Sequence, residues 1–150
     1  MKNISSEWFE CKVRYQKEVD GEYKKVSEIY TVDALTFTES EARITDEMSK
    51  YISGEYSVID IKKAPYKEVL FNEDDNASYW YKCKVGFITI DEKTEKEKIQ
   101  NFTYLVQAEN LLQATKLIND EMYTTGGDYI ITEVKETKVI DVIVHKSIED

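Results

Sequence analysis

The sequence predicts an α+β protein made by tandem duplication of a β-β-α-β unit, with a mainly antiparallel sheet and two helices packed on one face. Three observations support this prediction: an internal repeat, a strand-to-helix change of hydrophobic period inside each copy, and turn or capping residues at the boundaries. A unit of about 70 residues is only marginally stable alone. We therefore expect the two copies to share one core.

The repeat runs through most of the chain in a constant order. The opening motif WFECKV at 8–13 returns as WYKCKV at 80–85. Three further segments match in sequence order: 30–34 with 104–108, 44–48 with 118–122, and 56–62 with 129–135. Chance similarity between amphipathic segments does not keep such an order. The predicted organisation is a first repeat at 1–71, an acidic linker at 72–79 and a second repeat at 80–150.

Each repeat opens with an alternating strand, which indicates a half-buried strand. Cys11 and Val13 share one face of the first strand, and Cys83 and Val85 share one face of its counterpart. Asp20-Gly21 predicts a tight hairpin turn, because glycine readily adopts positive φ. The second repeat has a longer charged turn over 91–98, and a second strand follows in each case.

A helix is predicted after the second strand of each repeat. Thr38 with Glu41, and Asn110 with Gln113, have the spacing of a capping box. Glycines at 54 and 126–127 are placed to end the helices. The apolar stripes expected to face the core are Ile44, Met48, Tyr51 and Ile52 in the first helix and Ala114, Leu117, Ile118 and Met122 in the second.

The composition limits the classes of protein that the chain can belong to. Of 150 residues, 41% are hydrophobic and 12% aromatic, which is enough for a packed core. Thirty acidic residues against 20 basic ones give a net charge of −10, which disfavours non-specific binding to a phosphate backbone. Met1 to Glu7 contain no apolar run, so we expect no signal peptide. No stretch approaches the roughly 18 apolar residues of a spanning helix, so we expect no membrane span and a cytoplasmic protein with reduced cysteines.

No cluster of residues for catalysis, metal binding or cofactor binding is visible. His145 is the only histidine, and Cys11 and Cys83 are interpreted as small buried hydrophobes. The acidic pairs 46–47 and 120–121 recur in both repeats, and we favour a solvated helix face over general acid–base catalysis. We therefore predict a protein that is not an enzyme, with no catalytic residue, metal or cofactor.

The face of each first strand that carries tryptophan is the predicted interaction surface. Aromatic and basic side chains alternate there, as in sheets that bind single-stranded nucleic acid, but also as in protein interfaces and protected strand edges. Its residues are Trp8, Lys12, Arg14, Trp80, Lys82 and Lys84.

Segments at 8–15, 32–44 and 104–108 resemble an uncharacterised family of small proteins, the domain of unknown function family 4494. The resemblance covers nearly the whole chain. It implies an origin in Bacteroidetes or their bacteriophages, including the crAss-like group, and it carries no catalytic residues.

Our leading expectation is therefore a phage or mobile-element accessory protein that acts by contact with a protein partner or by self-association. One alternative is a single-stranded nucleic-acid binder that uses the Trp/Lys faces, although the net charge disfavours it. The other is a protein that binds a small ligand at the junction of the repeats.

Overall fold

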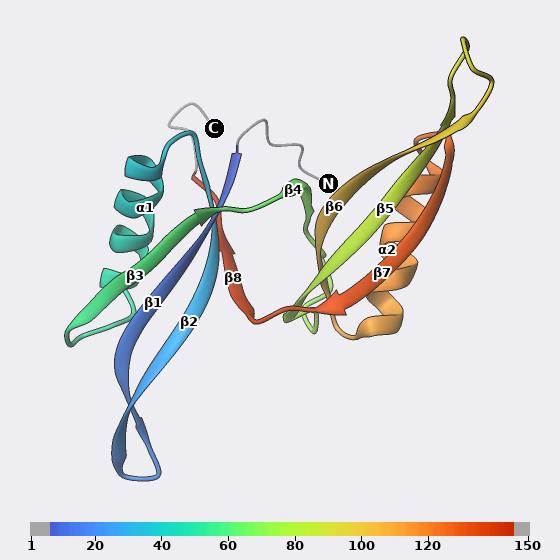
Figure 1. The fold of residues 1–150 in the computed structure, drawn as a ribbon. Coiled ribbons are helices and arrows are strands. Elements are labelled where there is room, and N and C mark those ends of the chain that lie inside the picture. The colour runs from blue at the N-terminus through green and yellow to red at the C-terminus, as the bar shows by residue number, and fades with distance from the viewer. Residues whose placement is uncertain (1–6, 146–150) are drawn as a thin grey trace. The chain divides into compact units, whose positions relative to one another are not determined.

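The computed structural model describes residues 7–145 and confirms an α+β protein with a β-β-α-β order in each half (Figure 1). The strands form two four-stranded sheets, each with its own helix, where the sequence predicted one mainly antiparallel sheet with two helices on one face. The elements of the first half are β1 (Glu7–Val19), β2 (Glu22–Ala34), α1 (Phe37–Ser49), β3 (Tyr56–Lys63) and β4 (Tyr66–Leu70). Those of the second half are β5 (Tyr79–Ile90), β6 (Glu97–Ala108), α2 (Leu111–Tyr123), β7 (Asp128–Glu136) and β8 (Val139–Ile143).

The two sheets have the same internal pattern, in the orders β3-β1-β2-β8 and β4-β6-β5-β7. Three strands of each sheet are antiparallel neighbours, and the fourth strand is parallel to its partner. The shared pattern defines equivalent positions in the two units. The common origin of the repeats stays a prediction.

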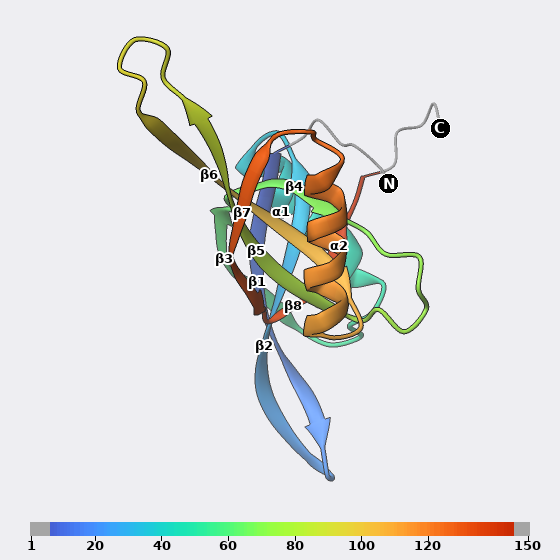
Figure 2. The ribbon, with the colours of Figure 1, turned by 90° about the vertical axis from the view of Figure 1, so that its right-hand side faces the viewer.

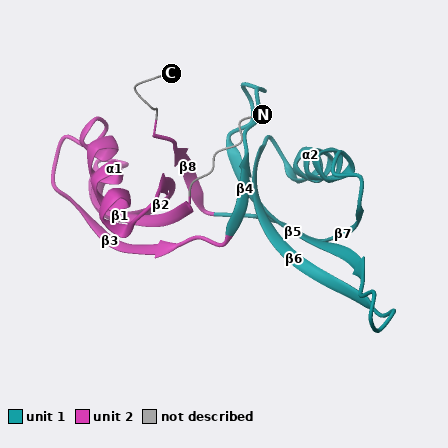
Figure 3. Cartoon of the chain, turned by 90° about the horizontal axis from the view of Figure 1, so that it is seen from above, with its two compact units in different colours: residues 1–4, 66–137 teal, residues 5–65, 138–150 magenta. Residues whose placement is uncertain are grey.

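The fourth strand of each sheet comes from the other sequence repeat. Strand β4 follows the first repeat but pairs with β6, and β8 follows the second repeat but pairs with β2. The compact units consequently differ from the repeats at 1–71 and 80–150: unit 1 contains residues 66–137, and unit 2 contains 5–65 and the chain from 138 onward (Figure 3). The first residues, on which the expectation about a signal peptide rests, lie outside the described part.

Both long hairpins continue beyond the strand that flanks them. In unit 2, β3 pairs with β1 only as far as Tyr15, whereas the β1–β2 pairing continues to Val19 and Glu22. The free part of each hairpin is a two-stranded ribbon (Figure 2). Asp20 and Gly21 both have positive φ, 52° and 80°, which confirms the predicted tight turn.

The helix caps are equivalent in the two units. Asn110 accepts a hydrogen bond from the Gln113 backbone at 2.8 Å, as the capping box predicts. The Gln113 side chain in turn accepts one from the N–H of Glu109, one residue before the cap. In α1 the cap is Thr36 with Glu39, at 3.1 Å, and not Thr38 with Glu41. The prediction was wrong by two residues because Thr38 already lies inside the helix.

A hydrophobic core lies between the helix and the sheet in each unit. Ile44 and Met48 lie in the core of unit 2, and their counterparts Ile118 and Met122 lie in the core of unit 1, as predicted. Tyr51 is an exception: it follows the end of α1 and is 74% exposed. The expectation that the two repeats share one core stays a prediction.

Candidate functional site

The two tryptophans are not exposed, so the predicted stacking surface is wrong in its aromatic part. Trp8 is 3% exposed and Trp80 2% exposed. They do lie on the sheet face opposite the helix, as the alternation predicted. Trp80 packs edge-on against Phe71 with ring centroids 5.7 Å apart. An indole has a large apolar surface, and its removal from water stabilises the fold.

The tryptophan backbone also holds the chain where it leaves each unit. The Trp8 carbonyl accepts a hydrogen bond from Ala64 N–H at 2.8 Å, immediately before the chain enters β4. The Trp80 carbonyl accepts one from Thr137 N–H at 2.9 Å, immediately before β8. The tryptophans therefore have an evident structural role at equivalent positions.

Two of the four basic residues of the predicted surface lie opposite acids, and the other two do not. Lys12 and Arg14 are exposed, but Lys12 lies opposite Asp60 in the strand register. Lys84 forms an ion pair with Glu133 at 3.6 Å, and Lys82 is half-buried. The acids opposite Lys12 and Lys84 interrupt the continuous basic stripe that binding to a phosphate backbone favours.

A carboxylate pair next to a tyrosine occurs at equivalent positions in both units. In unit 1, Glu68 of β4 lies opposite Tyr104 in the register. Burial and then the negative charge of Glu121 on α2 raise the pKa of Glu68. Burial and these two carboxylates raise the pKa of Tyr104 to about 12.

The same arrangement recurs in unit 2. Asp141 of β8 lies opposite Tyr30, and Glu47 of α1 is close enough for its charge to act on Asp141. Burial raises the pKa of Asp141 and the Glu47 charge adds to this, although a hydrogen bond from Val142 N–H acts against the shift. Glu47 and Glu121 are half-buried, whereas Asp46 and Asp120 are exposed. The predicted solvated face is thus confirmed for only one residue of each acidic pair.

Four isoleucines form an exposed apolar face on unit 1. Ile88 lies opposite Ile99, and Gly86 lies opposite Ile130, all on the side of the sheet away from α2. A Cβ atom at Gly86 would be 2.9 Å from the Ile99 side chain and 3.4 Å from that of Ile130, so both side chains close over the glycine. The isoleucine face comprises Ile88, Ile90, Ile99 and Ile130, of which Ile90 is 68% and Ile99 54% exposed.

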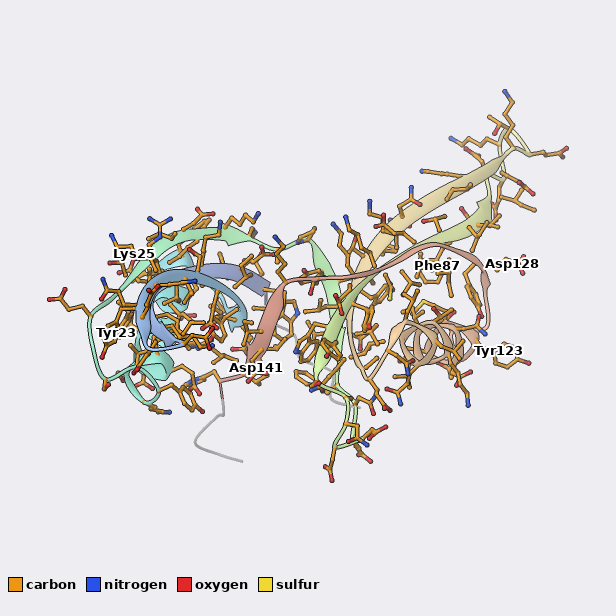
Figure 4. The ribbon with its side chains drawn as sticks, turned by 90° about the horizontal axis from the view of Figure 1, so that it is seen from below. Tyr23, Lys25, Phe87, Tyr123, Asp128 and Asp141 are labelled. Atoms are coloured by element: carbon orange, nitrogen blue, oxygen red, sulfur yellow. The ribbon has the colours of Figure 1, made fainter. Side chains whose placement is uncertain are left out.

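The corresponding region of unit 2 is an open polar pocket of about 600 Å³ at the base of the β1–β2 ribbon. The loop between α1 and β3 forms its second wall. Figure 4 shows Tyr23 and Lys25, which come from the hairpin. Its charged lining residues are Arg14, Lys25 and Glu55, and its hydroxyl-bearing ones include Tyr23, Ser53 and Ser57.

The remaining candidates for chemistry are structural. Cys11 and Cys83 are free and fully buried, and burial raises the pKa of each thiol to about 12. Within residues 7–145, no three histidine, cysteine, aspartate or glutamate side chains are grouped so as to hold a metal ion. His145 is exposed, and its backbone N–H donates to the Asp33 carboxylate at 3.1 Å.

The acidic linker predicted at 72–79 is an ordered connection inside unit 1. The Asn72 side chain donates to Gln107 O at 3.1 Å and to the Gln113 side chain at 3.1 Å. A hydrogen bond from Asn76 N–H and one from Gln113 lower the pKa of Asp74. These bonds fasten the segment to the start of α2.

The chain is thus a two-unit α+β protein whose equivalent surfaces have diverged, one apolar and one polar. It belongs to the family described as domain of unknown function (DUF4494), whose model matches residues 7–145. No curated protein matches the chain, and no solved structure does. In the part of the chain that the structure describes, no helix has the length and apolar character needed to cross a membrane.

Proposed function

We propose that the protein acts by contact with a protein partner, without catalysis, and that the isoleucine face of unit 1 is the contact surface. The observation that carries this proposal is the exposure of Ile90, Ile99 and Ile130 on one sheet face. Contiguous apolar groups in water are typical of interaction sites. On the β5–β6 ribbon, a partner can approach this face from the side of the sheet away from α2.

The comparison between units supports this assignment. The positions equivalent to Ile88, Ile99 and Ile130 are Gln16, Lys25 and Ser57 in unit 2. The architecture therefore accepts polar side chains at these positions, so folding does not require the isoleucines. Because this face is apolar in unit 1 alone, it is consistent with a function that unit 2 does not share.

The partner has an apolar surface, and the protein works in the cytoplasm of a Bacteroidetes cell as an accessory factor of a phage or mobile element. The origin rests on the resemblance of the segments at 8–15 and 32–44 to proteins of that group. A nucleic-acid partner is a weaker alternative, because the tryptophans are buried and acids lie opposite Lys12 and Lys84.

The test replaces residues of the isoleucine face with those that unit 2 has at the same places. Ile99→Lys with Ile130→Ser should lower the amount of each specific partner recovered from a Bacteroidetes lysate by at least about tenfold, because a charge in the centre of an apolar contact is costly to desolvate. Circular dichroism should show an unchanged fold.

The matched control is Lys25→Ile with Ser57→Ile, which places isoleucines at the same positions of unit 2. This variant should keep every partner of the wild-type protein. Analytical ultracentrifugation of both variants reports whether the partner is a second copy of the chain. Equal recovery of all partners by the wild type and by Ile99→Lys/Ile130→Ser contradicts the proposal.

A further inference from the structure

The pocket of unit 2 has the size and the chemistry of a small-molecule site. Its volume of about 600 Å³ lies in the range of ligand pockets, roughly 300–1,000 Å³. It opens between the projecting β1–β2 hairpin and the 52–57 segment, so that a ligand would contact two separate parts of the chain.

Positive charge is concentrated in this pocket although the chain as a whole is acidic. Arg14 and Lys25 contribute two cations against the single carboxylate of Glu55. They lie diagonally on neighbouring strands and on one face, since Arg14 is opposite Ser27 and Gln16 is opposite Lys25. Like charges at such positions repel each other, so a bound anion between them would stabilise the arrangement.

Neither cation is engaged by a carboxylate of the described residues. The Arg14 guanidinium has only a long hydrogen bond, 3.5 Å, from Nε to the Ser27 hydroxyl. Its remaining N–H groups are directed at no acceptor in residues 7–145. A guanidinium offers several donors in one plane, which suits the tetrahedral oxygens of a phosphate.

The fold does not require these charges. The positions equivalent to Arg14 and Lys25 are Gly86 and Ile99 in unit 1, at the same places in the sheet register. Ser57 likewise corresponds to Ile130. At the three positions where unit 2 has two cations and a hydroxyl, unit 1 thus has isoleucine or glycine, and the same fold forms.

Aromatic rings complete the lining. Tyr23 is 72% exposed on the hairpin and, two residues from Lys25 in β2, lies on the same face as this cation. Exposed aromatic faces next to cations are suited to a planar ring that carries an anionic group.

We propose that this pocket binds a small phosphate-bearing molecule with a planar ring, of the nucleoside monophosphate class. Arg14 and Lys25 hold the phosphate, the Ser53 and Ser57 hydroxyls donate to its remaining oxygens, and Tyr23 stacks on the ring. Because the site is on unit 2, this inference is independent of the protein contact proposed for unit 1.

The test is a titration of the protein with AMP, monitored by the NMR chemical shifts of the backbone amides. Shifts are expected to saturate in residues 14–16, 23–25 and 53–57. Arg14→Gly with Lys25→Ile, the residues of unit 1, should weaken binding at least about tenfold. A matched control, Lys93→Gly with Lys98→Ile, removes the same charge from the β5–β6 ribbon and should leave binding unchanged.

Three other probes separate the parts of the proposal. Inorganic phosphate should bind more weakly than AMP at the same residues, and adenosine should not bind detectably. Binding of adenosine as tight as that of AMP, or equal losses in the two double variants, would overturn the phosphate site. Affinity that rises steadily with the length of a single-stranded oligonucleotide would overturn the small ligand in favour of nucleic acid.

Discussion

Glu68 is the residue through which pH most directly acts on unit 1. Its pKa is raised by burial and by the Glu121 charge, so the folded protein binds a proton there at a higher pH than the unfolded chain does. The folded state is therefore favoured below the ordinary carboxyl pKa and loses this stability as the pH rises through the raised value. The charged form of Glu68 is thus unfavourable in the folded protein, first because the side chain is half-buried and second because of the Glu121 charge.

Replacing this carboxylate with its neutral isostere should therefore stabilise the protein at neutral pH. Glu68→Gln is expected to raise the free energy of unfolding at pH 7 by roughly 0.3–1 kcal/mol, the size of a partly exposed charge interaction. The difference should shrink at pH 3.5, where Glu68 is protonated. Thermal unfolding at both pH values measures it.

The matched control for this prediction is Asp120→Asn, since Asp120 is the exposed neighbour of Glu121 on α2. It should change the midpoint of unfolding by less than Glu68→Gln at either pH. A Glu68→Gln variant that is less stable than the wild type at pH 7 contradicts the assignment of a repulsive pair.

At the scale of elements, the start of α1 is set by Thr36 rather than Thr38. Thr36→Ala should lower the free energy of unfolding by about 1 kcal/mol, because the N–H of Glu39 loses its acceptor at the helix end. Thr38→Ala, an exposed change inside the first turn, is the control and should have a smaller effect. Urea unfolding followed by circular dichroism compares the two variants.

Elements with local signals could be predicted from the sequence. The Asp20-Gly21 turn and the Asn110–Gln113 box depend on contacts over two to five residues, so both were found. The cap of α1 was misplaced because Thr36 and Thr38 offer the same hydroxyl at neighbouring positions. The strand alternation also placed Trp8 on the correct face, but exposure depends on what covers that face, which a single strand does not encode.

The candidate sites were harder to predict for a related reason. Glu68 and Asp141 meet their partners Glu121 and Glu47 only because the last strand of each repeat pairs in the other unit. The pocket and the isoleucine face also depend on residues far apart in the chain. One local signal was present: glycine at position 86 interrupts an alternating strand exactly where the first repeat has Arg14.

At the scale of the whole molecule, unit 2 needs a strand from the far end of the chain. Truncation after Thr137 removes β8, including the buried Val139 and Val142, and leaves the edge of β2 unpaired. Hydrogen exchange should then show lost protection in β1, β2 and α1, while α2 and β5 keep theirs.

Truncation after His145 is the control, since it keeps β8 whole and should leave both units protected. Equal loss of protection in the two units after removal of β8 would contradict the division of the chain into these units.

The exchange of last strands also sets an order for folding during synthesis. The described part of unit 1 is one continuous segment, 66–137, and can be completed as soon as that segment has left the ribosome. Unit 2 begins earlier in the chain but lacks β8 until residues 139–143 have been made, after the segment 66–137 is complete. N-terminal parts usually fold first on the ribosome. In this protein the β1–β2 hairpin must instead wait with an open edge until β8, which is made after 66–137, pairs with β2.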